Sequence, residues 1–187
     1  MARLVVLNGS PRPMGNSAFL AGKAIAAADG TGASSTRFDV AHLSIAPCKG
    51  CDACRRNPER GCAIKDDMGG IVEELQAADA LLIATPVYWF SLGAQIKACI
   101  DRLYAPWNAD NAFMKGKRIG AALVYGDADL YRSGGINAVS TIEHMCRVLD
   151  AELRGFAYGT ANGPGDAAKN TSLVTEVEEL ARSLLRR

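Results

Sequence analysis

The sequence predicts an α/β fold, a three-layer sandwich in which helices cover both faces of a five-stranded parallel sheet with strand order 2-1-3-4-5. Two patterns favour this fold. Apolar runs typical of strands alternate with stretches whose apolar residues recur at helical spacing, and this alternation requires parallel strands joined by crossover helices. The first, third and fourth runs are continuously apolar and so belong in the middle of the sheet, whereas the second and fifth alternate and so belong at its edges.

The first half of the chain is expected to contain two strands, two helices and one long loop. Residues 4–7 form a continuous apolar strand, and 18–28 is a helix-forming stretch rich in alanine. Residues 36–40 alternate between polar and apolar side chains, as an edge strand does. Residues 44–67 show no periodicity, and the acidic pair Asp66-Asp67 then caps a helix over 68–78.

The second half continues the alternation. Continuous apolar runs predict buried strands at 80–84 and 119–124, and an alternating run predicts the fifth strand at 153–158. Apolar residues at helical spacing predict helices at 92–103, 139–149 and 173–184, with Cys99 and Cys146 on their buried faces. No linker divides the chain, so 1–187 is expected to be one domain with a cysteine-rich loop insertion at about 44–67.

Composition narrows the choice of partners and compartment. The chain has 21 Lys and Arg against 20 Asp and Glu, a net charge of +1, which gives no electrostatic reason to expect nucleic acid or a membrane surface as partner. No apolar run is long enough to span a membrane, and the N-terminus does not resemble a signal peptide, so we expect a cytoplasmic protein. In that compartment the six cysteines are not expected to form structural disulfides.

The loop that follows the first strand, residues 8–17, is suited to a phosphate group. Ser10, Asn16 and Ser17 supply small hydrogen-bonding side chains, the glycines permit close backbone approach, and the N–H groups of the next helix face an anion. No Asp or Glu occurs in residues 1–28. The pattern matches neither the dinucleotide-binding nor the P-loop signature. The alternative to a phosphate site is an ordinary turn between a strand and a helix, in which Gly, Ser and Asn serve as turn and capping residues.

The loop that follows the third strand is suited to a flat ring. Tyr88, Trp89 and Phe90 are adjacent, so they cannot all point into the core, and one of them is expected to stack on a planar ligand. The alternative is that they cover a helix or fill a subunit interface. In the predicted strand order this loop, the loop 8–17 and the segment 125–129 meet at the carboxyl edge of the sheet, where an anion pocket beside a ring shelf indicates FMN.

Four segments together resemble a known family. They are Gly9-Ser10-Pro11-Arg12 with Gly15-Asn16-Ser17, the cysteines 48, 51, 54 and 62, the run Asp66-Asp67-Met68, and Thr85-Pro86-Val87-Tyr88-Trp89. The combination resembles the flavodoxin-like NAD(P)H-dependent FMN reductases, and among them the iron–sulfur flavoproteins. The resemblance covers roughly the first hundred residues.

The resemblance implies a set of cofactor contacts. The phosphate and ribityl chain of FMN are expected to be held by Ser10, Arg12, Gly15, Asn16 and Ser17. The isoalloxazine ring is expected to be bordered, largely through backbone N–H groups, by Pro86, Val87, Tyr88, Trp89 and Phe90, with Gly126 and Asp127 at its far side. No catalytic side chain is expected, because FMN itself transfers the hydride. Pro13 and Met14 stand where the family commonly has lysine or asparagine, so the loop is stiffer here.

The cysteine loop has the spacing of a metal site. Cys48, Cys51 and Cys54 are separated by two residues each, Cys62 follows within reach, and cationic side chains outnumber acidic ones around them, as suits a [4Fe–4S] cluster held by four thiolates. Three alternatives stay open: a structural zinc, metal-free thiols that are free or reversibly oxidised, and small hydrophobic packing residues.

The expected function is therefore that of an FMN-dependent oxidoreductase. It would pass electrons from NAD(P)H to flavin, a quinone or another small acceptor. One alternative is an iron–sulfur flavoprotein that carries electrons between FMN, a [4Fe–4S] cluster and a redox protein, and another is a non-catalytic flavin-binding regulator. An exposed aromatic patch of Tyr104, Trp107 and Phe113 would suit a homodimer or homotetramer.

Overall fold

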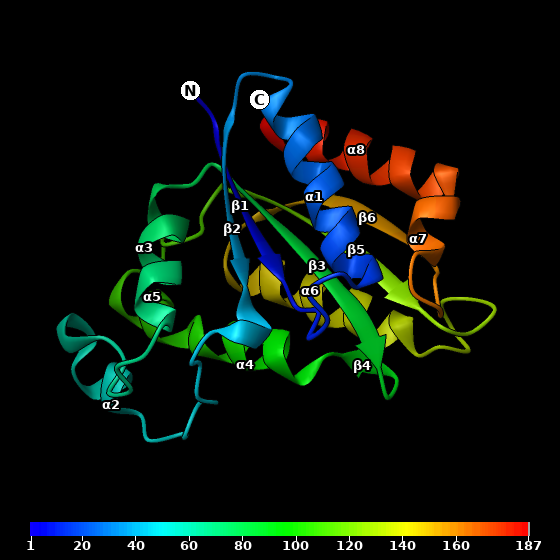
Figure 1. The fold of residues 1–187 in the computed structure, drawn as a ribbon. Coiled ribbons are helices and arrows are strands. Elements are labelled where there is room, and N and C mark those ends of the chain that lie inside the picture. Colours follow the sequence, from blue (N-terminus) through cyan, green and yellow to red (C-terminus); the bar gives the residue numbers. More distant parts are fainter. Residues whose placement is uncertain (187) are drawn as a thin grey trace.

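The computed structural model describes residues 1–186 and contains a central sheet with helices on both faces (Figure 1). The strands are β1 (Arg3–Asn8), β2 (Ser34–Asp39), β3 (Ala80–Tyr88), β4 (Ser91–Leu92), β5 (Arg118–Tyr125) and β6 (Glu152–Thr160). The five long strands are parallel and lie in the order β2-β1-β3-β5-β6. This confirms the predicted order, with the fourth and fifth predicted strands corresponding to β5 and β6.

The helices form the two outer layers. Their bounds are α1 (Asn16–Asp29), α2 (Ala53–Arg56), α3 (Met68–Ala77), α4 (Ala94–Arg102), α5 (Tyr104–Ala109), α6 (Gly135–Val148), α7 (Asp166–Lys169) and α8 (Thr171–Leu185). Helices α1 and α8 lie side by side on one face of the sheet, whereas α3, α4 and α6 cover the other (Figure 1). Two single-turn 3₁₀ helices, η1 (Val40–His42) and η2 (Pro58–Arg60), lie in the segment between β2 and α3. None of the described helices is long and apolar enough to cross a lipid bilayer.

The central strands are apolar at every position because both of their faces are buried. In β1, Val5 and Leu7 pack in the core under α3, α4 and α6, whereas Leu4 and Val6 pack in the core under α1 and α8. Strand β3 repeats this alternation, with Leu82 in the α1 core. The two predicted core cysteines, Cys99 and Cys146, are buried under the α4 and α6 side. The sequence signal for central strands therefore reflects the two-sided core.

Strand β3 extends further than the sequence predicts, because Pro86, Val87 and Tyr88 belong to the strand rather than to a loop. Pro86 is tolerated there for a geometric reason. The Ala84 carbonyl faces β1 and accepts from the Gly9 N–H at 2.8 Å. Alternate residues of a strand direct their backbone groups to the same side, so the backbone nitrogen of Pro86 also faces the β1 side. The last β1–β3 pair is Asn8–Ala84, so no β1 residue lies opposite Pro86. A proline at that position breaks no ladder hydrogen bond.

A two-residue strand, β4, pairs antiparallel with the end of β3 and is not predicted by the sequence. The turn between the strands is made by Trp89 and Phe90, whose φ angles are 46° and 67°. These left-handed conformations are uncommon for aromatic residues. The Phe90 carbonyl accepts a hydrogen bond from the Asn137 side chain at 2.9 Å, and Gly134, with φ of 71°, leaves the space that the turn occupies.

The segment 104–117, expected to be irregular, begins with the helix α5. Pro106 suggests a break, yet it lies in the first turn of α5, where backbone N–H groups have no partner within the helix. Phe113 is buried, so the expected aromatic patch is reduced to Tyr104 and Trp107, whose ring centroids lie 6.0 Å apart. The homodimer or homotetramer stays a prediction.

Candidate functional site

A pocket of about 310 Å³ opens at the carboxyl edge of the sheet, between the segments that leave β1, β3, β5 and β6. Nine residues expected at a cofactor site line it: Ser10, Arg12, Gly15, Asn16, Ser17, Pro86, Val87, Tyr88 and Gly126. Four further residues complete the wall: Val124, Tyr125, Ala161 and Asn162. The structure thus brings three predicted segments together and adds a fourth, the segment after β6.

The segment after β1 folds into a tight cradle. The Ser10 hydroxyl donates to the Arg12 carbonyl at 3.1 Å and accepts from the Arg12 N–H at 3.2 Å. A Cβ atom at Gly15 would lie 2.5 Å from the Ser10 Oγ, so only glycine fits there. Gly15 therefore allows the backbone of this segment to pack closely against Ser10.

A hydrogen-bond chain anchors this cradle to the neighbouring strand. The Asn8 side chain accepts from the Ser10 N–H at 3.2 Å and donates to Asp39 at the end of β2 at 2.7 Å. Asp39 also pairs with Arg37 at 2.7 Å. Burial raises the pKa of Asp39, but the hydrogen bonds from Asn8 and Arg37 outweigh it, so the net pKa is lowered and the carboxylate stays charged.

Asn16, the first residue of α1, fixes the opposite wall. Its amide nitrogen donates to the carbonyls of Ala161 and Gly163 at 3.1 and 2.9 Å, and its oxygen accepts from the Ala167 N–H at 3.2 Å. Both amide hydrogens and the oxygen are thereby used. In this arrangement Asn16 positions the segment after β6, and both N–H donors of its amide are already in use.

Ser17 lines this pocket with a buried hydroxyl group. Ser17 is 1% exposed, and its Oγ has no hydrogen-bond partner within residues 1–186. Buried hydroxyl groups are rarely left in that state. Gly15 gives α1 no side-chain cap, and among the described residues that line the pocket Arg12 is the only charged one. The pocket is therefore suited to an anion at the start of α1.

Three expected ring contacts lie outside this pocket. Trp89, 92% exposed, and Phe90 form the tip of the β3–β4 turn and do not line the pocket. Asp127 accepts from the Ala128 N–H at 2.7 Å and lies 3.6 Å from Arg132. The end of β3 and the segment 124–126 border the pocket instead. Asn162, which the sequence analysis does not single out, is detectable only by its position after the fifth strand.

The four loop cysteines converge on a second cavity. Cys48 and Cys51 are exposed, Cys54 and Cys62 are half-buried, and all four line a cavity of about 50 Å³. Burial raises the pKa of Cys54, and the nearby sulfurs of Cys62 and Cys48 raise it further. Even so, in the part of the chain that the structure describes, no three Cys, His, Asp or Glu side chains lie close enough to hold a metal ion. The thiols share one cavity without forming a closed ligand set.

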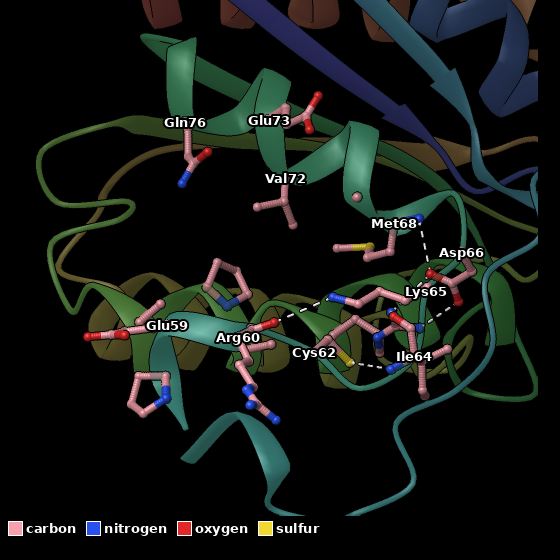
Figure 2. Close-up of a pocket in the computed structure, with 17 residues that line it drawn as sticks. Glu59, Arg60, Cys62, Ile64, Lys65, Asp66, Met68, Val72, Glu73 and Gln76 are labelled. Atoms are coloured by element: carbon pink, nitrogen blue, oxygen red, sulfur yellow. Dashed lines mark hydrogen bonds and ion pairs between the residues drawn. The ribbon is translucent and has the colours of Figure 1, made fainter. Parts of the chain in front are cut away.

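A larger cavity of about 600 Å³ adjoins the cysteine loop. Figure 2 shows Met68 and Val72 of α3 facing Arg60 and Cys62 across it. Cys62 belongs to the walls of both cavities.

One ion pair holds the cysteine loop to the sheet layer. Arg102, at the end of α4, donates to both carboxylate oxygens of Asp66, at 2.7 and 2.9 Å, and both side chains are almost fully buried. Arg102 also donates to the carbonyls of Ala46 and Ile64, at 2.8 and 3.2 Å. These two residues lie just before Cys48 and just after Cys62, so a single guanidinium ties the two ends of the loop together.

The two core cysteines differ from those in the loop. Burial raises the pKa of Cys99 to about 12 and that of Cys146 to about 11. Both thiols therefore stay protonated at neutral pH, and their predicted place in the core is confirmed.

The chain matches a known protein family and is similar to several known proteins. A family model described as NADPH-dependent FMN reductase matches residues 2–157. An iron–sulfur flavoprotein of Archaeoglobus fulgidus is 39% identical over 182 residues, which cover 97% of this chain and 91% of that protein. An iron–sulfur flavoprotein of Methanocaldococcus jannaschii is 30% identical over 183 residues, covering 93% and 90% of the two chains. The solved structure of the Trp repressor binding protein from Bacillus subtilis has a TM-score of 0.71 at 25% identity and covers 98% of this chain and 99% of that one.

The Asp66–Arg102 pair predicts a specific loss of stability in acid. Hydrogen bonds from Arg102 lower the pKa of Asp66 and outweigh the burial that raises it. The stabilisation of the folded state by this ion pair is therefore complete above about pH 4, the pKa of an Asp in the unfolded chain. It is lost as the pH falls through the lower pKa that Asp66 has in the folded state. The free energy of unfolding, measured by urea denaturation between about pH 2 and pH 6, should fall less steeply in acid for Asp66→Asn than for the wild type. Asp101→Asn, which removes an exposed pair with Lys97, is the matched control; a wild-type slope in Asp66→Asn would contradict the prediction.

Proposed function

This chain belongs to the family of NADPH-dependent FMN reductases, and on that premise we propose that it oxidises NAD(P)H and reduces flavin, a quinone or another small acceptor. The observation that supports the proposal most is the anion cradle beside the end of β3. An unsatisfied Ser17 hydroxyl, an uncapped helix start and a glycine that admits no side chain meet in one pocket. These features fit the phosphate of FMN.

We assign the contacts residue by residue. The cradle of Ser10, Arg12, Gly15 and Ser17 would hold the phosphate, while Asn16 would keep the neighbouring wall in place. The ring would lie against the backbone of 86–88 and be closed off by Gly126. Trp89, Phe90 and Asp127 lie outside the pocket, so we assign them no contact.

Few side chains that line the pocket can donate or accept a proton near neutral pH. Among the described residues that line it there is no Asp, Glu, His, Lys or Cys. Burial raises the pKa of Tyr125, and Tyr158 and Asp129 raise it further, so its hydroxyl stays neutral. FMN, when bound, supplies the redox chemistry by accepting a hydride from NAD(P)H and releasing the electrons to an acceptor. The protein's part is to bind, orient and partly shield the cofactor.

A second function is favoured by the cysteine loop. The four thiols line one cavity, and the donor set is the one that a [4Fe–4S] cluster requires. We propose that Cys48, Cys51, Cys54 and Cys62 hold such a cluster, with the exposed Cys48 and Cys51 turning inward to close the ligand set. The cluster, when bound, would pass single electrons between FMN and a redox protein partner.

The reductase proposal is tested by anaerobic titration of the FMN-loaded protein with NADPH and with NADH. We expect either nucleotide to bleach the visible flavin absorbance and added quinone or flavin to restore it. A protein that binds FMN and is bleached by dithionite, but by neither nucleotide, would instead be a non-catalytic flavin-binding regulator.

The Ser17→Ala variant tests the phosphate cradle. A lost hydrogen bond to a charged group costs about 1.5–3 kcal/mol, so the Kd for FMN should rise by roughly 10- to 100-fold. Quenching of FMN fluorescence on titration with metal-free, flavin-free protein measures the Kd. Ser183→Ala, which removes a hydroxyl from the end of α8, should leave the Kd unchanged. A Kd in Ser17→Ala equal to that of the wild type would remove Ser17 from the site.

The Cys51→Ser variant tests the cluster. Wild-type protein purified without oxygen should contain about four irons per chain with matching sulfide, and Cys51→Ser should lose most of both. Cys146→Ala, a change in a buried core cysteine, should keep them. Stoichiometric zinc in the wild type, or no metal at all, would instead support one of the alternatives for the loop.

A further inference from the structure

Arg102 has one hydrogen-bond donor more than the structure uses. A guanidinium carries five N–H groups in a fixed fork. Its two terminal nitrogens donate to Asp66 twice, to Ala46 once and to Ile64 once. The fifth, on Nε, is buried and has no partner among residues 1–186. Because Arg102 is 3% exposed, water does not readily satisfy this group.

The surroundings of Arg102 indicate which atom this donor serves. Arg102 and Cys62 line both cavities of the cysteine loop. The Cys62 sulfur accepts from the Ile64 N–H at 3.4 Å, and the Ile64 carbonyl accepts from Arg102. The hydrogen bond to Asp66 raises the pKa of Arg102 most, and the nearby Cys62 sulfur raises it further. Cys62 is therefore a neighbour of the guanidinium as well as a thiol of the loop.

We propose that Arg102 is a positioning residue of the cysteine loop that clamps its two ends and directs its remaining N–H to the sulfur of Cys62 when that sulfur is bound to iron. The inference rests on the proposed [4Fe–4S] cluster. The clamp brings Cys62 to the cavity that the other three thiols line. The N–H then gives one ligand sulfur a hydrogen-bond donor that the exposed cations of the loop do not supply in a fixed geometry.

Loss of this hydrogen bond should change the reduction potential of the cluster, although the net charge near the cluster stays almost the same. Asp66 neutralises Arg102, so the pair contributes little to the field at the cluster. A hydrogen bond to a ligand sulfur, however, stabilises the reduced and more negative cluster and so raises its midpoint potential. Loss of the N–H should therefore lower the potential, whereas loss of the negative charge on Asp66 should not.

The test compares Arg102→Lys, Asp66→Asn and the control Arg55→Lys, which changes an exposed cation of the same loop. The midpoint potential of the cluster is measured by redox titration followed by electron paramagnetic resonance. Limited proteolysis of the loop in the metal-free protein measures the clamp. We expect Arg102→Lys to show a more negative potential and faster cleavage. Asp66→Asn should show faster cleavage with a potential that is unchanged or more positive, and Arg55→Lys should match the wild type in both.

Each contrary outcome has its own meaning. An unchanged potential in Arg102→Lys, or equal negative shifts in Arg102→Lys and Asp66→Asn, would overturn the hydrogen bond to Cys62. Wild-type cleavage of Arg102→Lys would overturn the clamp. A wild-type protein that takes up no cluster would overturn the cluster proposal and the hydrogen bond with it, while the proteolysis still decides the clamp. If Arg102→Lys does not fold, the double variant Arg102→Gln with Asp66→Asn, which removes the buried charges together, takes its place with the same expected fall in potential.

Discussion

The pairing of β1 with β3 is the constraint on which the pocket at the carboxyl edge of the sheet depends. It ends at the Asn8–Ala84 pair and the Gly9 N–H to Ala84 carbonyl bond, while β3 continues to Tyr88. The chain after β1 is therefore free to turn away and form the cradle beside the extended end of β3. A longer β1 would fill the pocket with backbone, and a shorter β3 would remove its ledge. The pocket thus forms because β3 extends beyond the end of its neighbour β1.

The two sites of the molecule are built in different ways. The pocket at the carboxyl edge is shaped by backbone: a glycine with no room for a side chain, a helix start, and the end of a strand. The cysteine loop, by contrast, depends on one buried ion pair between side chains far apart in the sequence. The first kind of site follows from the topology of the sheet, since strand ends must meet there. The second depends on the presence of Arg102 and Asp66.

This difference explains what the sequence could and could not reveal. Strand order was predictable because two-sided burial leaves a continuous apolar run, as in β1 and β3, and the cradle was predictable because its residues are contiguous. Strand β4 was not, because nothing in Trp89 and Phe90 signals a left-handed turn. That conformation is supported by Asn137 of α6 and by Gly134, which directly precedes α6. Arg102 looks like an ordinary last-turn cation of a helix, and only tertiary structure shows that Asp66 and two distant carbonyls meet it.

The closure of the cysteine loop has a consequence for the redesign of this chain. Ser44 and Asp67 are joined by two hydrogen bonds, from the Asp67 N–H to the Ser44 carbonyl at 3.1 Å and from the Ser44 N–H to the Asp67 carboxylate at 2.7 Å. The insertion therefore leaves and rejoins the main body at a single point, much as a hairpin does. Such a segment can be shortened or replaced without altering the register of any strand. The loop can therefore be redesigned as a separate unit while the sheet keeps its pairing.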